Sequence, residues 1–266
     1  MLVTAKFVYI HQPKTGGTFV SAMLRRLHEA RGGTATTVWI DPDRPAPLPA
    51  VAADDVLTVM LPTRHQHGAR RNIPAVYHNR PILATVRNPY DRYVSQYEFA
   101  WWRRYPEMFG PVADVTRCYP NYPDLTFDEF LRITNEVSVP FRSANHPAET
   151  PGFHTQQFVE FFFRDPEAAY PRLLEKSSTT PWWADELRGI WFIDQTHLND
   201  QLANRLTAWG YSPSDAQAVR EAPHIWPPEG GRAADHGWQP YYTPQSTAFV
   251  RHKERWLFEW FPHWQV

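Results

Sequence analysis

The stretch Lys6-Phe-Val-Tyr-Ile-His-Gln-Pro-Lys-Thr-Gly-Gly-Thr18 places a glycine loop directly after a short apolar run. Apolar residues then recur at helical spacing over 19–27, so we predict a strand over 6–10, a loop over 11–17 and a helix opened by Thr18. The first N–H groups of a helix lack partners within the helix and lie at its positive end. The loop therefore predicts an anion site inside an α/β fold.

The side chains of this loop suit an oxyanion. Gly16 and Gly17 let the backbone wrap around the anion, and Lys14 supplies a compact positive charge. Thr15 and Thr18 offer hydroxyl donors. In the kinase-type phosphate loop the lysine follows the last glycine, whereas here it precedes both glycines. The alternative is an ordinary strand-to-helix turn.

A second motif, Arg87-Asn-Pro-Tyr-Asp-Arg-Tyr-Val-Ser95, follows the predicted strand 81–86. Arg87 ends that strand, where open α/β sheets bind ligands. Asn88-Pro89 is a helix start, and Ser95 lies one turn beyond Asp91 on the same side of that helix. Arg87 and Ser95 could hold a second phosphate. The alternative is an ion pair between Arg87 and Asp91, with Ser95 incidental.

The rest of the chain alternates strands with helices. Predicted strands over 56–61 and 190–193 join those above, with helices over 89–103, 198–209 and 244–261 and a capping box at 126–129. This alternation predicts a central, mainly parallel sheet flanked by helices. We expect one domain over 1–266, with irregular proline- and aromatic-rich insertions at about 105–160 and 222–243.

Composition excludes several classes of protein. The 266 residues are 42% hydrophobic and 21% charged, as in a folded globular protein, and the net charge of −1 argues against nucleic acid as a partner. One cysteine excludes a disulfide framework and a cysteine-based zinc cluster. No apolar window is long enough to cross a bilayer, and the first residues are too short for a signal peptide. We expect a soluble, cytoplasmic protein.

Both motifs resemble those of a known family. Pro13-Lys-Thr-Gly-Gly-Thr18 is similar to the 5′-phosphosulfate loop of sulfotransferases that use 3′-phosphoadenosine 5′-phosphosulfate (PAPS), and 87–97 is similar to their 3′-phosphate motif. The loop most resembles the carbohydrate branch, which includes the heparan and uronyl 2-O-sulfotransferases and soluble bacterial relatives. The resemblance is firm over 6–104 and returns over 190–210 and 238–243.

This resemblance implies a P-loop-type three-layer fold and in-line transfer of a sulfuryl group from PAPS to an acceptor hydroxyl, leaving 3′,5′-ADP. The acceptor would be a sugar, a glycolipid or a small-molecule metabolite, and no metal is expected. Exposed aromatic helices would allow a homodimer. The implied donor-binding residues are Lys14, Thr15, Gly16, Gly17 and Thr18 for the 5′-phosphosulfate, with Arg87 and Ser95 for the 3′-phosphate.

The acceptor hydroxyl must lose a proton, which histidine or glutamate commonly takes. Arg64-His-Gln-His-Gly68 follows the second predicted strand and matches the family's placement of a histidine before the 3′-phosphate strand. In an extended segment His65 and His67 would face the same side, and we prefer His67 as the base. The alternatives are an incidental histidine pair, Glu29 as the base, or a metal pair that is short of ligands.

Other features leave alternatives open. Arg232 follows two glycines and could contact the 3′-phosphate, although a plain surface turn is the more typical explanation. The tryptophan pairs 101–102, 182–183 and 256/260 suit sugar stacking but are more typical of a core. Rival functions are an ATP-dependent kinase, for which only Asp194 suits the magnesium-binding acid, and a non-catalytic nucleotide- or glycan-binding module.

Overall fold

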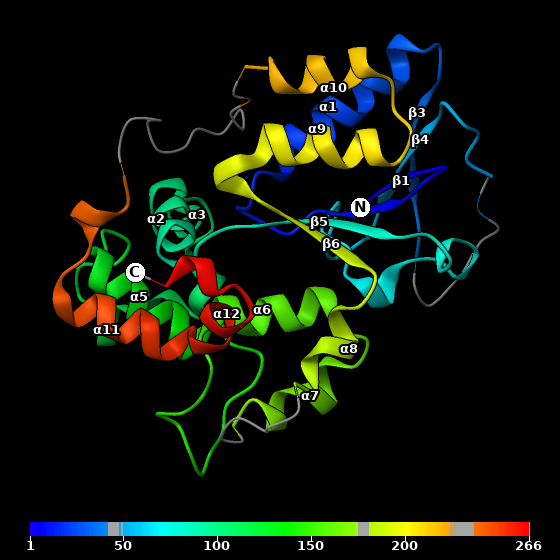
Figure 1. Ribbon diagram of the computed structural model, residues 1–266. Helices are drawn as coiled ribbons and strands as arrows, with labels where there is room; N and C mark the ends of the chain where they lie inside the picture. The colour runs from blue at the N-terminus through cyan, green and yellow to red at the C-terminus, as the bar shows by residue number, and fades with distance from the viewer. Residues whose placement is uncertain (42–47, 49, 175–180, 224, 226–236, 266) are drawn as a thin grey trace. The chain divides into compact units, whose positions relative to one another are not determined.

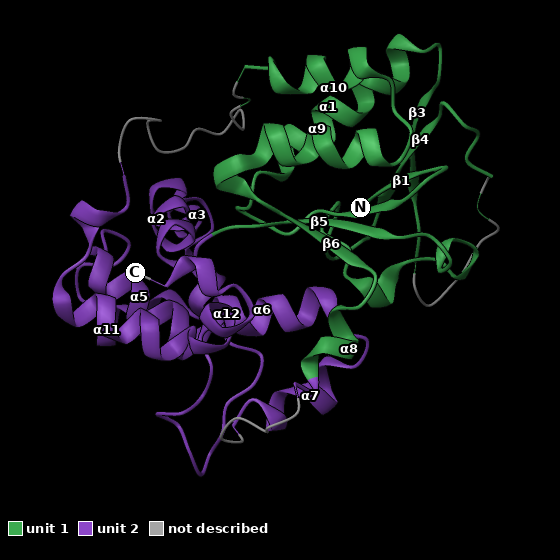
Figure 2. Cartoon of the chain, in the orientation of Figure 1, with its two compact units in different colours: residues 1–87, 183–227 green, residues 88–182, 228–266 purple. Residues whose placement is uncertain are grey.

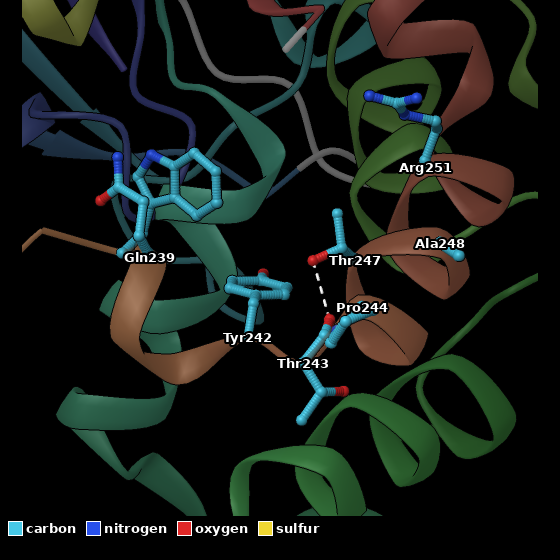
Figure 3. A pocket seen from close by; sticks show the side chains of 8 residues that line it. Gln239, Tyr242, Thr243, Pro244, Thr247, Ala248 and Arg251 are labelled. Carbon is cyan, nitrogen blue, oxygen red and sulfur yellow. Dashed lines mark hydrogen bonds between the residues drawn. The ribbon is translucent and has the colours of Figure 1, made fainter.

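The computed structural model describes residues 1–41, 48, 50–174, 181–223, 225 and 237–265. Its contacts group the chain into two compact units, residues 1–87 with 183–227 and residues 88–182 with 228–266 (Figure 2). The first unit contains the sheet, and the described part of the second unit is helical. The single domain expected over 1–266 stays a prediction.

The sheet of the first unit has six strands in the spatial order β3-β4-β1-β2-β5-β6. Pairing is parallel for β3 with β4, β2 with β5 and β5 with β6, whereas β1 is antiparallel to both of its neighbours. Five strands therefore share one direction, and the predicted α/β class with a mainly parallel sheet is confirmed. The strands are β1 (Leu2–Thr4), β2 (Val8–Ile10), β3 (Ala35–Trp39), β4 (Val56–Met60), β5 (Ile82–Val86) and β6 (Ile190–Asp194).

A tight turn between β1 and β2 reverses the chain shortly before the glycine loop. The Thr4 hydroxyl accepts from the Phe7 N–H at 3.0 Å, and the Thr4 N–H donates to the Phe7 carbonyl at 3.0 Å. These two bonds close a tight turn, so β2 begins at Val8 and not at Lys6 as the sequence predicted. Phe7 is fully buried although it lies in the turn, so the apolar run of the sequence begins before the strand does.

Three helices cover one face of this sheet: α1 (Gly17–Ala30), α9 (Leu198–Ala208) and α10 (Pro213–Arg220) (Figure 1). Their apolar faces form one buried cluster with strand residues such as Tyr9, Leu83 and Ile193. A short helix, α8 (Trp183–Leu187), precedes β6, and the single-turn helices η1 (Arg70–Asn72), η2 (Ala75–Tyr77) and η4 (Gln195–His197) complete the unit.

The described part of the second unit is built from helices α2 to α7, α11 and α12. The predicted helix over 89–103 is broken at Ala100, whose φ of 47° is left-handed and stops the helical hydrogen bonding. The expected capping box is present, because the Glu129 carboxylate accepts from the Thr126 N–H at 2.8 Å. The helices are α2 (Pro89–Phe99), α3 (Trp101–Arg104), α4 (Val112–Cys118), α5 (Phe127–Val137), α6 (Phe153–Phe162), α7 (Pro166–Arg172), α11 (Pro244–Lys253) and α12 (Arg255–Trp260).

The predicted helix over 244–261 is also divided, at Glu254. This side chain is fully buried and accepts from the N–H groups of His154 and Thr155, from the Thr155 hydroxyl and from the Tyr93 hydroxyl. Burial raises the pKa of the Glu254 carboxyl, and the four donated hydrogen bonds oppose that shift. Glu254 therefore caps the start of α6, for which Gly152 has no side chain.

Three of the six singled-out tryptophans are core residues. Trp102, Trp256 and Trp260 are buried among other rings, whereas Trp101 is 39% exposed. This favours the structural interpretation for the buried members. Among the described residues, no helix combines the length and apolar character that crossing a bilayer requires.

Candidate active site

The glycine loop lies between β2 and α1, at the carboxyl end of a strand. Lys14 and Gly16 have left-handed backbone conformations, with φ of 64° and 96°, and α1 begins at Gly17. The loop therefore turns sharply and presents the open N–H groups of the first helical turn. A partly buried Lys14 and Thr18 flank this turn. This cradle suits an anionic phosphosulfate, as the sequence predicted.

The Thr15 hydroxyl faces inward, where the sequence suggested an outward donor. Thr15 is fully buried, and its hydroxyl donates to the Gln12 carbonyl at 2.8 Å. The Thr85 hydroxyl lies 2.7 Å from it and must donate to it, and the Tyr9 hydroxyl, 3.1 Å from Thr85, continues the chain. Thr15 thus stabilises the loop conformation through its hydrogen bonds to Gln12 and to Thr85 of β5.

His11 packs directly on the start of α1. A methyl group added at Gly17 would lie 1.9 Å from His11 Cδ2 and 2.1 Å from Nε2, so only glycine fits beneath this ring. Burial, helped by the neighbouring imidazole of His67, holds the pKa of His11 well below its usual range. Sequence reasoning missed this residue, although a histidine that ends a strand immediately before the loop was a usable signal.

His67 is joined to the loop through His11. Its Nδ1 lies 2.9 Å from the His11 carbonyl oxygen, and the two rings meet edge to face with centroids 4.6 Å apart. An Nδ1–H that donates to this carbonyl leaves the lone pair on Nε2. Burial lowers the pKa of His67 below 6.5, and the hydrogen bond to His11 opposes the shift. His67 is therefore a neutral imidazole near pH 7, as a general base requires.

His65 does not share the face of His67, so the predicted extended segment is wrong. Leu61 and His65 exchange backbone hydrogen bonds of 2.8 and 2.7 Å, which close a turn, and His65 has a φ of 48°. Its exposed ring lies against Trp39, with centroids 5.9 Å apart. In the described part of the chain, no three metal-ligating side chains form a group.

Arg87 lies beside the loop because β2 and β5 are parallel neighbours, with Ile10 opposite Ala84. Its Nη1 donates to the Lys14 carbonyl oxygen at 3.4 Å. Ser95 lies on α2, in the other unit, where it is partly buried. Its contact with the 3′-phosphate stays a prediction.

Glu29 does not fit the structure as the base, Asp194 has a structural contact, and Arg232 lies outside the described part of the chain. Glu29 is exposed in the last turn of α1, roughly 18 Å along the helix from the loop at its start, too far to be the base. The Asp194 carboxylate accepts from the Thr196 N–H at 2.8 Å and caps η4. Arg232 lies outside the described residues.

Comparisons with known proteins identify the family of the chain. The model of the sulfotransferase family matches residues 2–168, which include the loop, both histidines and Arg87. The crystal structure of mouse sulfotransferase SULT7A1 complexed with PAP superimposes with a TM-score of 0.50 and 13% identity, over 98% of this chain and 90% of that one. No curated protein matches the sequence. The chain therefore belongs to the PAPS-dependent sulfotransferase family, as its two motifs predicted.

Proposed function

We propose that the chain moves a sulfuryl group from PAPS to a hydroxyl of a sugar, glycolipid or small-molecule acceptor, with His67 as the general base. The observation that carries this proposal is the contact chain that runs from His67 through His11 to the loop at Gly17. It brings a neutral imidazole to the phosphosulfate cradle within one compact unit. Family membership makes the activity PAPS-dependent sulfuryl transfer.

Each residue has a role that follows from its position. The first turn of α1 and Lys14 bind the 5′-phosphosulfate, and Lys14 neutralises negative charge there. Arg87 and Ser95 hold the 3′-phosphate. His67 takes the proton of the acceptor hydroxyl at Nε2 while the His11 carbonyl keeps its ring oriented. Bound PAPS supplies the activated sulfuryl group, so catalysis by the chain consists of positioning and charge stabilisation.

Calorimetric titration with 3′,5′-ADP, beside ATP with magnesium, tests the donor. We expect micromolar binding of the bisphosphate and much weaker binding of ATP. Tight ATP binding without a response to 3′,5′-ADP would favour a kinase. Binding of 3′,5′-ADP without turnover of PAPS across varied hydroxyl acceptors would favour a non-catalytic module.

Replacing Arg87 by alanine should weaken binding of 3′,5′-ADP by about 10- to 100-fold, because a hydrogen-bonded charge pair contributes about 1.5–3 kcal/mol. Titration calorimetry measures the change. Arg80→Ala is the matched control, since Arg80 precedes β5 as Arg87 follows it, and its guanidinium donates to the Thr4 carbonyl. Equal affinities of the Arg87→Ala and wild-type proteins would remove Arg87 from the donor site.

The dependence of kcat/KM on pH tests the base. Because burial lowers the pKa of His67, the protein should keep full activity near pH 7 and lose it only below pH 6.5, as His67 takes up a proton. His67→Ala should lower the rate by about 10²–10⁴-fold and abolish this acid limb. His65→Ala should retain the limb, since that side chain lies outside the contact with His11. If His65→Ala lost the acid limb and His67→Ala retained it, His65 would be the base.

A further inference from the structure

The edge strand β3 ends in Trp39, whose side chain is 59% exposed. Trp39 is paired in register with Met60 of β4, so the indole lies at the carboxyl edge of the sheet. The turn that carries His65 and His67 starts from the end of β4, and the His65 ring contacts Trp39. An exposed indole is therefore placed on the same edge, and in the same unit, as the proposed base.

We propose that Trp39 is a stacking site for a saccharide acceptor, whose sulfated ring lies at His67 and whose neighbouring ring lies on the indole. This inference rests on the proposed function and names the acceptor class for that site. The indole contacts His65, two residues before His67, so it would hold a ring next to the one at the base. The acceptor is thus an oligosaccharide or glycoside of at least two rings.

The surroundings of Trp39 favour a sugar over other occupants. A pyranose ring has an apolar face and a rim of hydroxyls, which match one aromatic ring among polar groups. The other residues of β3 are Ala35, Thr36, Thr37 and Val38, so within this described strand no further large apolar side chain extends the indole into the patch that a stable protein partner would require. A phenolic or lipid acceptor would instead need an enclosing apolar pocket.

The test measures binding of the labelled protein, saturated with 3′,5′-ADP, to immobilised glycans of one to four rings, with phenols on the same surface. Trp39→Ala should weaken binding of glycans with two or more rings by about tenfold or more, with one-ring glycans unaffected. Trp39→Phe should restore most of the binding. Trp191→Ala is the matched control, since Trp191 is a 44% exposed indole on β6 at the opposite edge of the sheet.

Several outcomes would overturn the inference. These are equal glycan binding by Trp39→Ala and the wild type, binding of phenols in place of glycans, or wild-type protein that binds 3′,5′-ADP but no glycan. Conversion of a dimer to a monomer by Trp39→Ala in light scattering would make the indole a subunit contact instead. Failure of the wild type to bind 3′,5′-ADP would overturn the proposed function, and this inference with it.

Discussion

Replacing Lys14 by alanine is expected to lower kcat by about 10²–10³-fold while the protein keeps its fold. The loop is the cradle at the start of α1, and the lysine is the cation that the sequence places on it. Removing a preorganised group that stabilises transition-state charge costs a rate factor of about this size. The measurement is the initial rate of 3′,5′-ADP release from PAPS in the presence of an accepted hydroxyl compound.

An unchanged backbone conformation and a matched lysine control allow the loss of rate in Lys14→Ala to be assigned to the side chain. Lysine and alanine meet the same backbone strain at a φ of 64°, because both carry a Cβ, so a change in stability is not expected from the turn itself. Lys6→Ala serves as the control. Lys6 lies in the same unit and donates to the Trp209 carbonyl at 2.7 Å, so its loss should affect stability and spare the rate. Full activity in Lys14→Ala would remove this loop from the proposed site.

Replacing Gly17 by alanine is expected to lower both the melting temperature and the activity, although alanine favours helices. The added methyl group would lie 1.9 Å from His11 Cδ2, which is closer than any real contact. His11 is only 5% exposed, so its ring cannot simply swing into solvent. Overpacking of this kind costs about 1–3 kcal/mol of unfolding free energy. Displacement of His11 would also disturb the carbonyl that orients His67, so we expect at least a tenfold loss of kcat/KM.

Thermal unfolding and steady-state rates of a double variant test this explanation. His11→Ala removes the clashing ring, so Gly17→Ala should lower the melting temperature much less in the His11→Ala background than in the wild type. Such non-additivity is expected only for residues in contact. If the two changes simply add, the loss in Gly17→Ala arises elsewhere.

The sequence predicted those strands that are apolar runs between turn residues. β4, β5 and β6 lie where the sequence predicted them, because each is a mainly apolar run of five residues bounded by turn-forming residues. β1 was missed because a strand of three residues is too short to show a periodic pattern of apolar side chains. β3 was missed because its five residues, Ala35 to Trp39, show no alternation of apolar and polar side chains.

The sequence predicted a helix end where the residues that cause it are close by in the chain. The start of α2 at Asn88-Pro89 and the capping box at Thr126 use side chains next to the helix, so the sequence shows them. The break at Glu254 does not have a local cause. Its carboxylate accepts hydrogen bonds from N–H groups about a hundred residues away on α6, and the sequence near Glu254 does not predict these bonds.

The same distinction applies to the site. The sequence by itself predicted an anion loop at 13–18 and indicated the family, because glycines, a lysine and a helix start are adjacent in the chain. Only the tertiary structure decided that His67, and not His65, meets the loop. That contact joins residues 56 positions apart through the carbonyl of His11, and it depends on a turn whose shape is set by pairing with Leu61.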